Sequence, residues 1–245
     1  RASALRALHL PGRPVILPNA WDVPSARAVA GAGFPAVATS SAAVAQTLGY
    51  ADGEATPVTE MLDAVARIVR AVGVPVTADL ERGYGLRPAE LVERLAAAGA
   101  AGCNLEDSDP ATGVLIDPER QAAFLAEVRA AARSAGVDLV VNARVDAFLH
   151  PTGTPEARFA DAVDRARRYF AAGADCVYPI LLGDLPTIAA FVREVGGPVN
   201  VLAALEGGPT PVEFAAAGVA RISYGSRIHA ALQHAHAELL SSLPR

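Results

Sequence analysis

Short runs of apolar and β-branched residues alternate along the chain with longer alanine-rich segments in which apolar residues recur at helical spacing. This alternation is typical of repeated strand–helix units that build a parallel sheet. The apolar runs predict eight strands, at residues 15–18, 34–39, 74–79, 101–105, 138–143, 175–179, 198–202 and 220–224. The remaining segments predict helices at residues 23–30, 58–71, 88–98, 117–135, 157–172, 185–195 and 210–217, and a closing helix at 226–243.

Eight strand–helix units with no linker between them predict an α/β fold of the (β/α)8 TIM-barrel type rather than an open sheet. The 245 residues are enough for a single barrel domain that spans residues 1–245. Hydrophobic residues make up 52% of the chain and charged residues only 19%, which indicates a large buried core.

Charge and composition exclude several classes of partner and chemistry. The net charge is −5 and the arginines are scattered, so we expect neither nucleic acid nor an anionic membrane surface as a partner. No apolar run approaches the roughly 20 residues that cross a bilayer, and no signal-peptide pattern opens the chain, so we expect a soluble, cytoplasmic protein. The chain has no lysine, which excludes an imine-forming aldolase. Cys103 and Cys176 lie in apolar runs and are expected to be buried free thiols.

Polar residues follow nearly every predicted strand at the same end. They are Asn19, Trp21, Asp22, Thr39, Ser40, Ser41, Asp79, Glu81, Arg82, Tyr84, Asn104, Glu106, Asp107, Ser108, Asn142, Arg144, Asp146, Tyr178, Asn200, Glu206, Ser223 and Tyr224. Polar side chains cost free energy in strands that are buried on both faces, unless they are paired or hydrated. Because barrel active sites form at the carboxyl ends of the strands, these residues predict one polar pocket.

Carboxylates dominate this predicted pocket. Asp79 and Glu81 are two apart on one strand and point the same way, while Glu106 and Asp107 come from the end of the neighbouring strand. Such acids repel one another unless a cation compensates them. A set of oxygen ligands without nearby His or Cys suits Mg2+, with Mn2+ as a second possibility, better than zinc. The alternative is that the acids form structural ion pairs with Arg82 and Arg144 at the barrel mouth.

Several motifs together resemble the phosphoenolpyruvate mutase/isocitrate lyase superfamily over residues 5 to 228. In chain order they are NAWD at 19–22, TSS at 39–41, LGYAD at 48–52, ADLERGYG at 78–85, GCNLEDS at 102–108 and NARVDAF at 142–148. The resemblance implies that Asp79 binds Mg2+ directly, and that Asp52, Glu81 and Glu106 hold metal-bound waters. It also implies that Arg144 grips a carboxylate or phosphonate of the substrate.

The same resemblance indicates how a small oxo-acid substrate would be held. Ser40, Ser41 and Ala42 match a turn whose backbone N–H groups and hydroxyl bind a second carboxylate. The family chemistry implies an α-oxo or α-hydroxy acid that chelates Mg2+ and leaves a pyruvate enolate when a bond beside its carbonyl breaks. Family members are usually tetramers that exchange their last barrel helix, so we expect a homotetramer or dimer. The tail 226–243 is compatible both with such an exchange and with ordinary closure of one barrel.

Other candidates rest on position in the predicted pocket. Asn19, Trp21, Tyr178 and Asn200 are expected to contact substrate, with Trp21 over the barrel mouth. The candidate catalytic residues are Arg144, Glu106 and Tyr84, although the Tyr84 hydroxyl either donates to substrate or packs in its turn.

The histidines are weaker candidates for the site. His150 either serves as an acid or base or lies solvated in its loop, and the second interpretation is favoured. His234 and His236 are two apart on a predicted helix and point to different faces, so they predict no metal site.

The loop at 108–119 departs from the lyases and mutases of the family. It contains neither the cysteine of the isocitrate and methylisocitrate lyases nor the lysine of the phosphoenolpyruvate mutases. Ser108, Asp109 and Thr112 occupy this region, and Asp109 would repel a dianionic phosphonate. The sequence therefore favours a Mg2+-dependent lyase that cleaves a C–C bond, similar to an oxaloacetate decarboxylase, because CO2 departs without a general acid. A P–C bond enzyme and a non-catalytic dicarboxylate-binding barrel are the alternatives.

Overall fold

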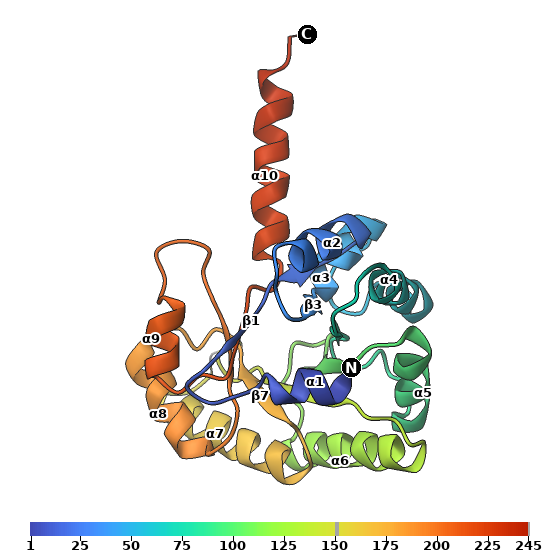
Figure 1. Ribbon diagram of the computed structural model, residues 1–245. Helices are drawn as coiled ribbons and strands as arrows, with labels where there is room; N and C mark the ends of the chain where they lie inside the picture. Colours follow the sequence, from blue (N-terminus) through green and yellow to red (C-terminus); the bar gives the residue numbers. More distant parts are fainter. Residues whose placement is uncertain (150–151, 245) are drawn as a thin grey trace.

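A computed structural model describes residues 1–149 and 152–244 and shows parallel strands that alternate with helices (Figure 1). The strands are β1 Val15–Leu17, β2 Asn19–Ala20, β3 Val37–Thr39, β4 Val76–Asp79, β5 Gly102–Leu105, β6 Val140–Val145, β7 Cys176–Pro179, β8 Asn200–Leu202 and β9 Arg221–Ser223. The helices are α1 Ala2–Ala7, α2 Val23–Gly31, α3 Ser41–Leu48, α4 Val58–Ala71, α5 Pro88–Ala98, α6 Pro118–Ser134, α7 Pro155–Ala171, α8 Leu185–Val195, α9 Pro211–Ala216 and α10 Arg227–Ser242.

Each of the eight predicted strands has a counterpart, and the first is divided at Pro18 because proline has no N–H to donate. One sheet has the order β2-β3-β4-β5-β6-β7 and the other the order β1-β9-β8, with every pairing parallel. The two sheets are linked by the continuous segment 15–20 and by a parallel bridge between Val177 and Val199. The prediction of an α/β fold with the strand–helix order of a TIM barrel is therefore confirmed.

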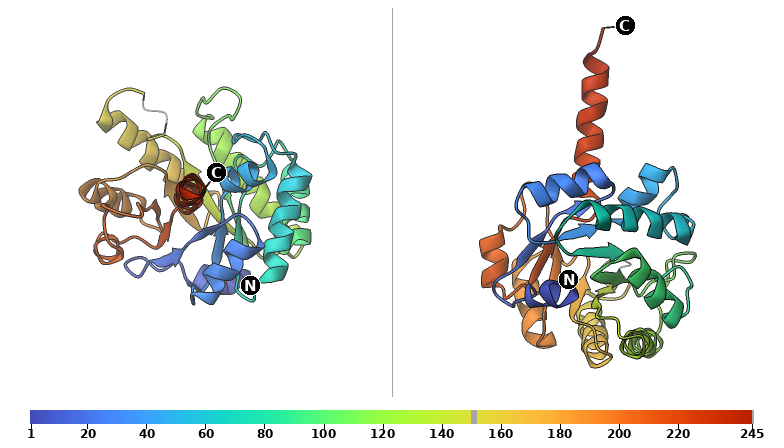
Figure 2. Two further views of the ribbon diagram at one scale, coloured as in Figure 1. Left: turned by 90° about the horizontal axis from the view of Figure 1, so that it is seen from above. Right: turned by 45° about the vertical axis from the view of Figure 1, so that its right-hand side comes forward.

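The helices lie around the strands, as the view along α10 shows (Figure 2). Their ends follow local chemistry, because several begin with proline in the first turn behind a side chain that caps the backbone N–H groups. Asp22, Asp117, Thr154, Asp184 and Thr210 provide these caps. The parallel register then brings the carboxyl ends of the strands to one side of the molecule, which is where the polar residues lie.

The opposite end of the strands is closed by α1, a helix that the sequence did not predict. Leu5 of α1 is fully buried and packs with an apolar cluster that includes Leu17, Ala38 and Val140. Gly102 allows this close approach, because a Cβ there would lie 2.7 Å from the Val140 carbonyl oxygen and 3.1 Å from Leu5. The buried face of α1 is therefore apolar, while Arg6 on the same helix pairs with Asp138 and Asp175.

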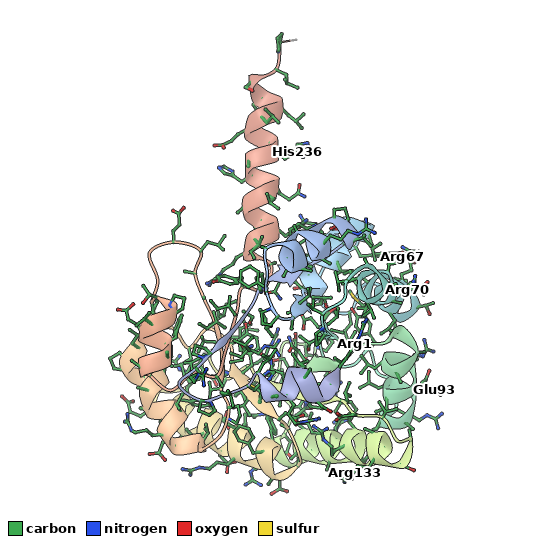
Figure 3. The ribbon with its side chains drawn as sticks, in the orientation of Figure 1. Arg1, Arg67, Arg70, Glu93, Arg133 and His236 are labelled. Carbon is green, nitrogen blue, oxygen red and sulfur yellow. The ribbon has the colours of Figure 1, made fainter. Side chains whose placement is uncertain are left out.

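The last helix, α10, is a helix as predicted, but it does not close its own barrel. It projects away from the body of the protein in two views, and its buried residue is His229, in its first turn (Figures 1 and 2). His236 lies on the projecting part (Figure 3). Leu232, Leu239 and Leu240 stay exposed along the helix. The interpretation of ordinary closure within one chain is therefore wrong. In the described part of the chain, no helix is long and apolar enough to span a membrane.

Candidate active site

A cavity of about 440 Å³ opens at the carboxyl ends of the strands. Ten of the residues predicted for the site line it, namely Asn19, Ser40, Ser41, Ala42, Asp52, Asp79, Glu81, Glu106, Arg144 and Tyr178. Three others do not line it, namely Trp21, Tyr84 and Asn200. The polar ends of strands that are far apart in the sequence therefore meet in one hollow.

Asp79 stands at the end of β4 with its carboxylate held on two sides. The backbone N–H and the hydroxyl of Ser41 both donate to Oδ2, at 2.9 and 2.8 Å. The side-chain amide of Asn104 lies 3.4 Å from Oδ1 on the neighbouring strand. These donors fix the carboxylate in one orientation, while its residue stays only half-buried and open to the cavity.

Glu81 follows two residues later in a turn with a left-handed backbone, at φ 48°. Its Oε2 accepts from the Glu54 backbone N–H at 2.6 Å and its Oε1 accepts from the Tyr84 hydroxyl at 2.8 Å. Burial raises the pKa of Glu81 to about 7, and the charges of Asp52 and Asp79 raise it further against the opposing hydrogen bonds. A nearby cation would therefore stabilise the ionised carboxylate.

Arg144 of β6 and Glu106, directly after β5, form an ion pair in the cavity lining. The Arg144 guanidinium contacts the Glu106 carboxylate, and its Nε donates to Asp146 at 2.6 Å. Burial raises the pKa of Glu106 well above its ordinary value, although the charge of Arg144 opposes this shift. The hydroxyl of Ser108 holds the other oxygen of Asp146 at 2.6 Å. Arg144 is thus oriented by a carboxylate on each side.

Asp107, which adjoins Glu106 in the sequence, points away from the cavity. It accepts hydrogen bonds from the Tyr169 hydroxyl at 2.6 Å and from the backbone N–H of Asp146 at 2.8 Å, and it pairs with Arg165 at 3.1 Å. Adjacent residues of an extended segment face opposite sides, so only one of the two acids can reach the pocket. Asp107 therefore holds the end of β6, beside Arg144, and does not line the site itself.

Three predicted site residues lie outside the cavity lining for separate structural reasons. Trp21 packs edge-on against His229, with 4.7 Å between ring centroids, at the base of α10. Asn200 is fully buried and exchanges hydrogen bonds of 3.2 Å with Ser223. Tyr84 turns its hydroxyl to Glu81 and so touches the site only through that carboxylate. Trp21 and Asn200 therefore do not line this cavity, and their contact with substrate stays a prediction.

The cysteines and histidines contribute little to this site. Cys103 and Cys176 are free and buried as expected, and burial raises the pKa of each thiol to about 12. His234 is exposed and lies 3.3 Å from Glu238 on the same helix. His150 lies outside the described residues.

Two residues have contacts in the site that the sequence did not predict: Asp146 was expected at the pocket without a role, and Glu54 was not expected there. Asp146 orients Arg144 from two positions further along the same segment, which the motif NARVDAF already contained. Glu54 binds the Glu81 turn from a loop 27 residues earlier in the chain, and sequence spacing carries no signal for such a contact.

The donor set is suited to a metal that keeps much of its water. Among residues 1–149 and 152–244, no three His, Cys, Asp or Glu side chains converge closely enough to form a direct ligand cage. Mg2+ commonly takes one or two carboxylates and fills its octahedron with water and substrate oxygens. Asp79 as direct ligand, with Asp52, Glu81 and Glu106 around it, fits this mode of binding.

Comparison with known proteins is consistent with this geometry. The chain matches the family described as phosphoenolpyruvate phosphomutase over residues 5–243. It is 36% identical to an uncharacterised Mycobacterium tuberculosis protein over 89% of this chain and 80% of the other. It is 31% identical to an oxaloacetate decarboxylase of Rhodopseudomonas palustris over 99% of this chain and 84% of that protein.

Structural similarity extends over the whole fold. The crystal structure of a candidate phosphonomutase from Burkholderia cenocepacia superposes with a TM-score of 0.93, at 44% identity, covering 98% of this chain and 99% of the other. A relative named as an oxaloacetate decarboxylase and a structure named as a candidate phosphonomutase are thus both similar to this chain. The chain belongs to the phosphoenolpyruvate mutase/isocitrate lyase superfamily of lyases and mutases.

Proposed function

We propose that this protein is a Mg2+-dependent lyase that cleaves a C–C bond of a short α-oxo or α-hydroxy acid, in a reaction similar to that of an oxaloacetate decarboxylase. One observation carries the proposal: the carboxylates of Asp79, Glu81 and Glu106 and the guanidinium of Arg144 line the same cavity. A cation on the carboxylates and an arginine opposite them would hold the two ends of a small dicarboxylate.

Four acids would hold the metal. Asp79 would bind it directly, because its carboxylate is fixed and faces the cavity, while Asp52, Glu81 and Glu106 would hold metal-bound waters. Mn2+ would fit the same oxygen donors. The bound metal would act as a Lewis acid that stabilises the negative charge of a pyruvate enolate.

The chain's own residues would bind and orient the substrate. Arg144 would take one carboxylate, because a planar guanidinium can donate two parallel hydrogen bonds to it. The second carboxylate would lie at Ser40, Ser41 and Ala42, where α3 begins. The Ala42 N–H would have to provide the backbone donor, because the N–H and hydroxyl of Ser41 already donate to Asp79. Asn19 and Tyr178 would complete the wall of the pocket.

The loop after β5 favours decarboxylation over phosphonate chemistry. Asp109 lines the cavity, and hydrogen bonds from the backbone N–H groups of Thr112 and Ala111 lower the pKa of its carboxyl, so it is ionised at neutral pH. Its negative charge would repel a phosphonate dianion, whereas departing CO2 is neutral. The second candidate is a P–C bond enzyme, which the 44% identity to the candidate phosphonomutase favours.

The projecting helix supports an oligomer. An isolated helix with three exposed leucines, Leu232, Leu239 and Leu240, would gain free energy by packing on another surface. We propose that α10 packs against a neighbouring subunit in a homodimer or homotetramer.

The reaction is tested by a panel of short oxo-acids assayed for pyruvate release with Mg2+ and with a chelator. We expect pyruvate from oxaloacetate or a related acid above the metal-catalysed background. Phosphonopyruvate followed by phosphorus NMR tests the second candidate, because loss or migration of its phosphorus shifts the signal. Ligand binding without turnover of any acid in the panel would indicate the non-catalytic dicarboxylate-binding alternative.

A further inference from the structure

Glu54, which lies outside the cavity lining, makes two short hydrogen bonds to the turn after Glu81. One carboxylate oxygen, Oε1, accepts from the backbone N–H of Tyr84 at 2.6 Å and from that of Arg82 at 3.1 Å. In return, the backbone N–H of Glu54 donates to Oε2 of Glu81 at 2.6 Å. The two loops are therefore joined reciprocally, each through a side-chain carboxylate and backbone N–H groups.

The backbone at this junction is strained on both sides. Glu54, Glu81 and Tyr84 all have left-handed backbones, with φ of 60°, 48° and 57°. Residues other than glycine avoid this region, and they keep it only where surrounding contacts hold them there. All three strained residues take part in these hydrogen bonds, together with Arg82, so the contacts between the loops hold the strained backbone in place.

This junction fixes two of the acids proposed to surround the metal. Asp52 lines the cavity two residues before Glu54, in the loop that Glu54 fastens. Glu81 has each of its oxygens held by one donor, one of which is the Glu54 backbone N–H. Each oxygen keeps a lone pair for a metal-bound water.

We propose that Glu54 is a positioning residue for the metal site, which holds Asp52 and Glu81 at the spacing that Mg2+ and its waters require. This inference rests on the proposed function, because it assumes that the cavity binds Mg2+. Glu54 acts through hydrogen bonds to backbone N–H groups and contacts neither metal nor substrate.

Two substitutions separate this role from a simple effect of charge. Both N–H groups bond the same oxygen of Glu54, so the amide oxygen of Glu54→Gln can accept both bonds after the negative charge is gone. Glu54→Ala removes the acceptor. We expect Glu54→Gln to keep a Mg2+ dissociation constant close to that of the unchanged protein, and Glu54→Ala to weaken Mg2+ binding about 10- to 100-fold. Isothermal titration calorimetry with MgCl2 alone measures both constants without reference to any reaction.

Glu213→Ala is a matched control. The Glu213 carboxylate accepts a 2.8 Å hydrogen bond from the Thr210 backbone N–H at the start of α9, away from the cavity. Its loss should leave the Mg2+ dissociation constant unchanged. If Glu54→Ala fails to fold, Glu54→Asp replaces it, because the shorter side chain cannot reach both N–H groups, and weaker Mg2+ binding is expected again.

Three results would overturn the proposal in distinguishable ways. Unchanged Mg2+ affinity in Glu54→Ala, or in Glu54→Asp where that variant is used, would show that Glu54 does not position the site. An equal loss in Glu54→Gln and Glu54→Ala would show that Glu54 acts through its charge. Absence of Mg2+ binding in the unchanged protein would contradict the proposed function together with this inference.

Discussion

The two ends of the strands are built in opposite ways. At the amino ends, Leu5 of α1 packs into a buried apolar cluster, and Gly102 lets it approach Val140 closely. At the carboxyl ends, buried acids and arginines surround a cavity of about 440 Å³. Burial of the apolar cluster stabilises the fold, whereas the carboxylates in the cavity repel one another and so destabilise it. Substitutions at the amino ends should therefore change the free energy of unfolding but not Mg2+ binding. Substitutions in the cavity should change Mg2+ binding and activity but not the fold.

The largest effect is expected from Asp79→Ala. Loss of the proposed direct ligand should abolish Mg2+ binding and lower Mg2+-dependent turnover by about 10³-fold or more, because the developing enolate charge loses its main partner. Calorimetry with MgCl2 and a pyruvate assay measure the two losses. Circular dichroism should show an intact fold. A variant that kept full Mg2+-dependent behaviour would show that the metal lies elsewhere.

At the other end, Leu5→Ala should lower the free energy of unfolding by about 2–5 kcal/mol, because it empties a fully buried position. Denaturant titration measures this loss. Val212→Ala, at a position that is 78% exposed, is the control and should change stability by less than about 0.5 kcal/mol. Leu5→Ala should bind Mg2+ normally. A large loss of Mg2+ affinity in this variant would mean that the two ends are coupled.

Arg144→Lys should lower kcat/KM by about 10²-fold, equivalent to about 2.7 kcal/mol, because an ammonium cannot donate the bidentate pair that a carboxylate accepts. Arg94→Lys is the matched control, since Arg94 pairs with Glu90 on the surface of α5. Steady-state kinetics on the accepted oxo-acid compares the two variants. Near-normal activity in Arg144→Lys would exclude Arg144 as the carboxylate-binding residue.

The smallest expected effect is a dependence of metal affinity on pH. Burial raises the pKa of Glu81 to about 7 in the metal-free protein, so Mg2+ must displace a proton below that pH. Mg2+ affinity should rise as pH increases from about 6 to about 8, by at most about tenfold per pH unit. Calorimetry in buffers with different ionisation enthalpies counts the released proton. Affinity that does not change with pH would contradict this coupling.

The same shift has a consequence for the stability of the metal-free protein. The folded-state pKa of Glu81 lies above the unfolded value of 4.5, so the folded chain binds the proton more tightly. Its contribution to the free energy of unfolding is greatest below about pH 4.5 and is lost as pH rises to about 7. With saturating Mg2+, which binds the ionised carboxylate, the free energy of unfolding should instead rise with pH near neutrality.

Periodicity predicted the strands and most helices because each buries apolar residues at a regular spacing. It missed α1, whose six residues become stable only through contact with the barrel end. It also missed α3, which begins directly after a strand at the capping residue Ser40. The direction of α10 could not be predicted, because an amphipathic pattern does not reveal whether its partner surface belongs to the same chain.

Site residues at the ends of strands could be predicted from the alternation of side chains along each strand. Site residues whose contacts join two loops could not. Asp79 and Arg144 stand at strand ends, so their position in the cavity followed from the fold. Asn200 lies outside the cavity lining and exchanges hydrogen bonds with Ser223 on the adjacent strand, a pairing that the sequence did not indicate. Glu54 could not be predicted from the sequence, because its role depends on a left-handed backbone and on a contact between two loops.

The most direct test of the proposed site is the melting temperature of the protein with oxalate, a stable mimic of the pyruvate enolate, in the presence and absence of Mg2+. Oxalate with Mg2+ at about 100 times its dissociation constant should stabilise the fold by about 2.7 kcal/mol. Either compound alone should have a much smaller effect, and Asp79→Ala should show no response to the pair. An unchanged melting temperature, or an equal rise in Asp79→Ala, would contradict a Mg2+ site that holds an oxo-acid.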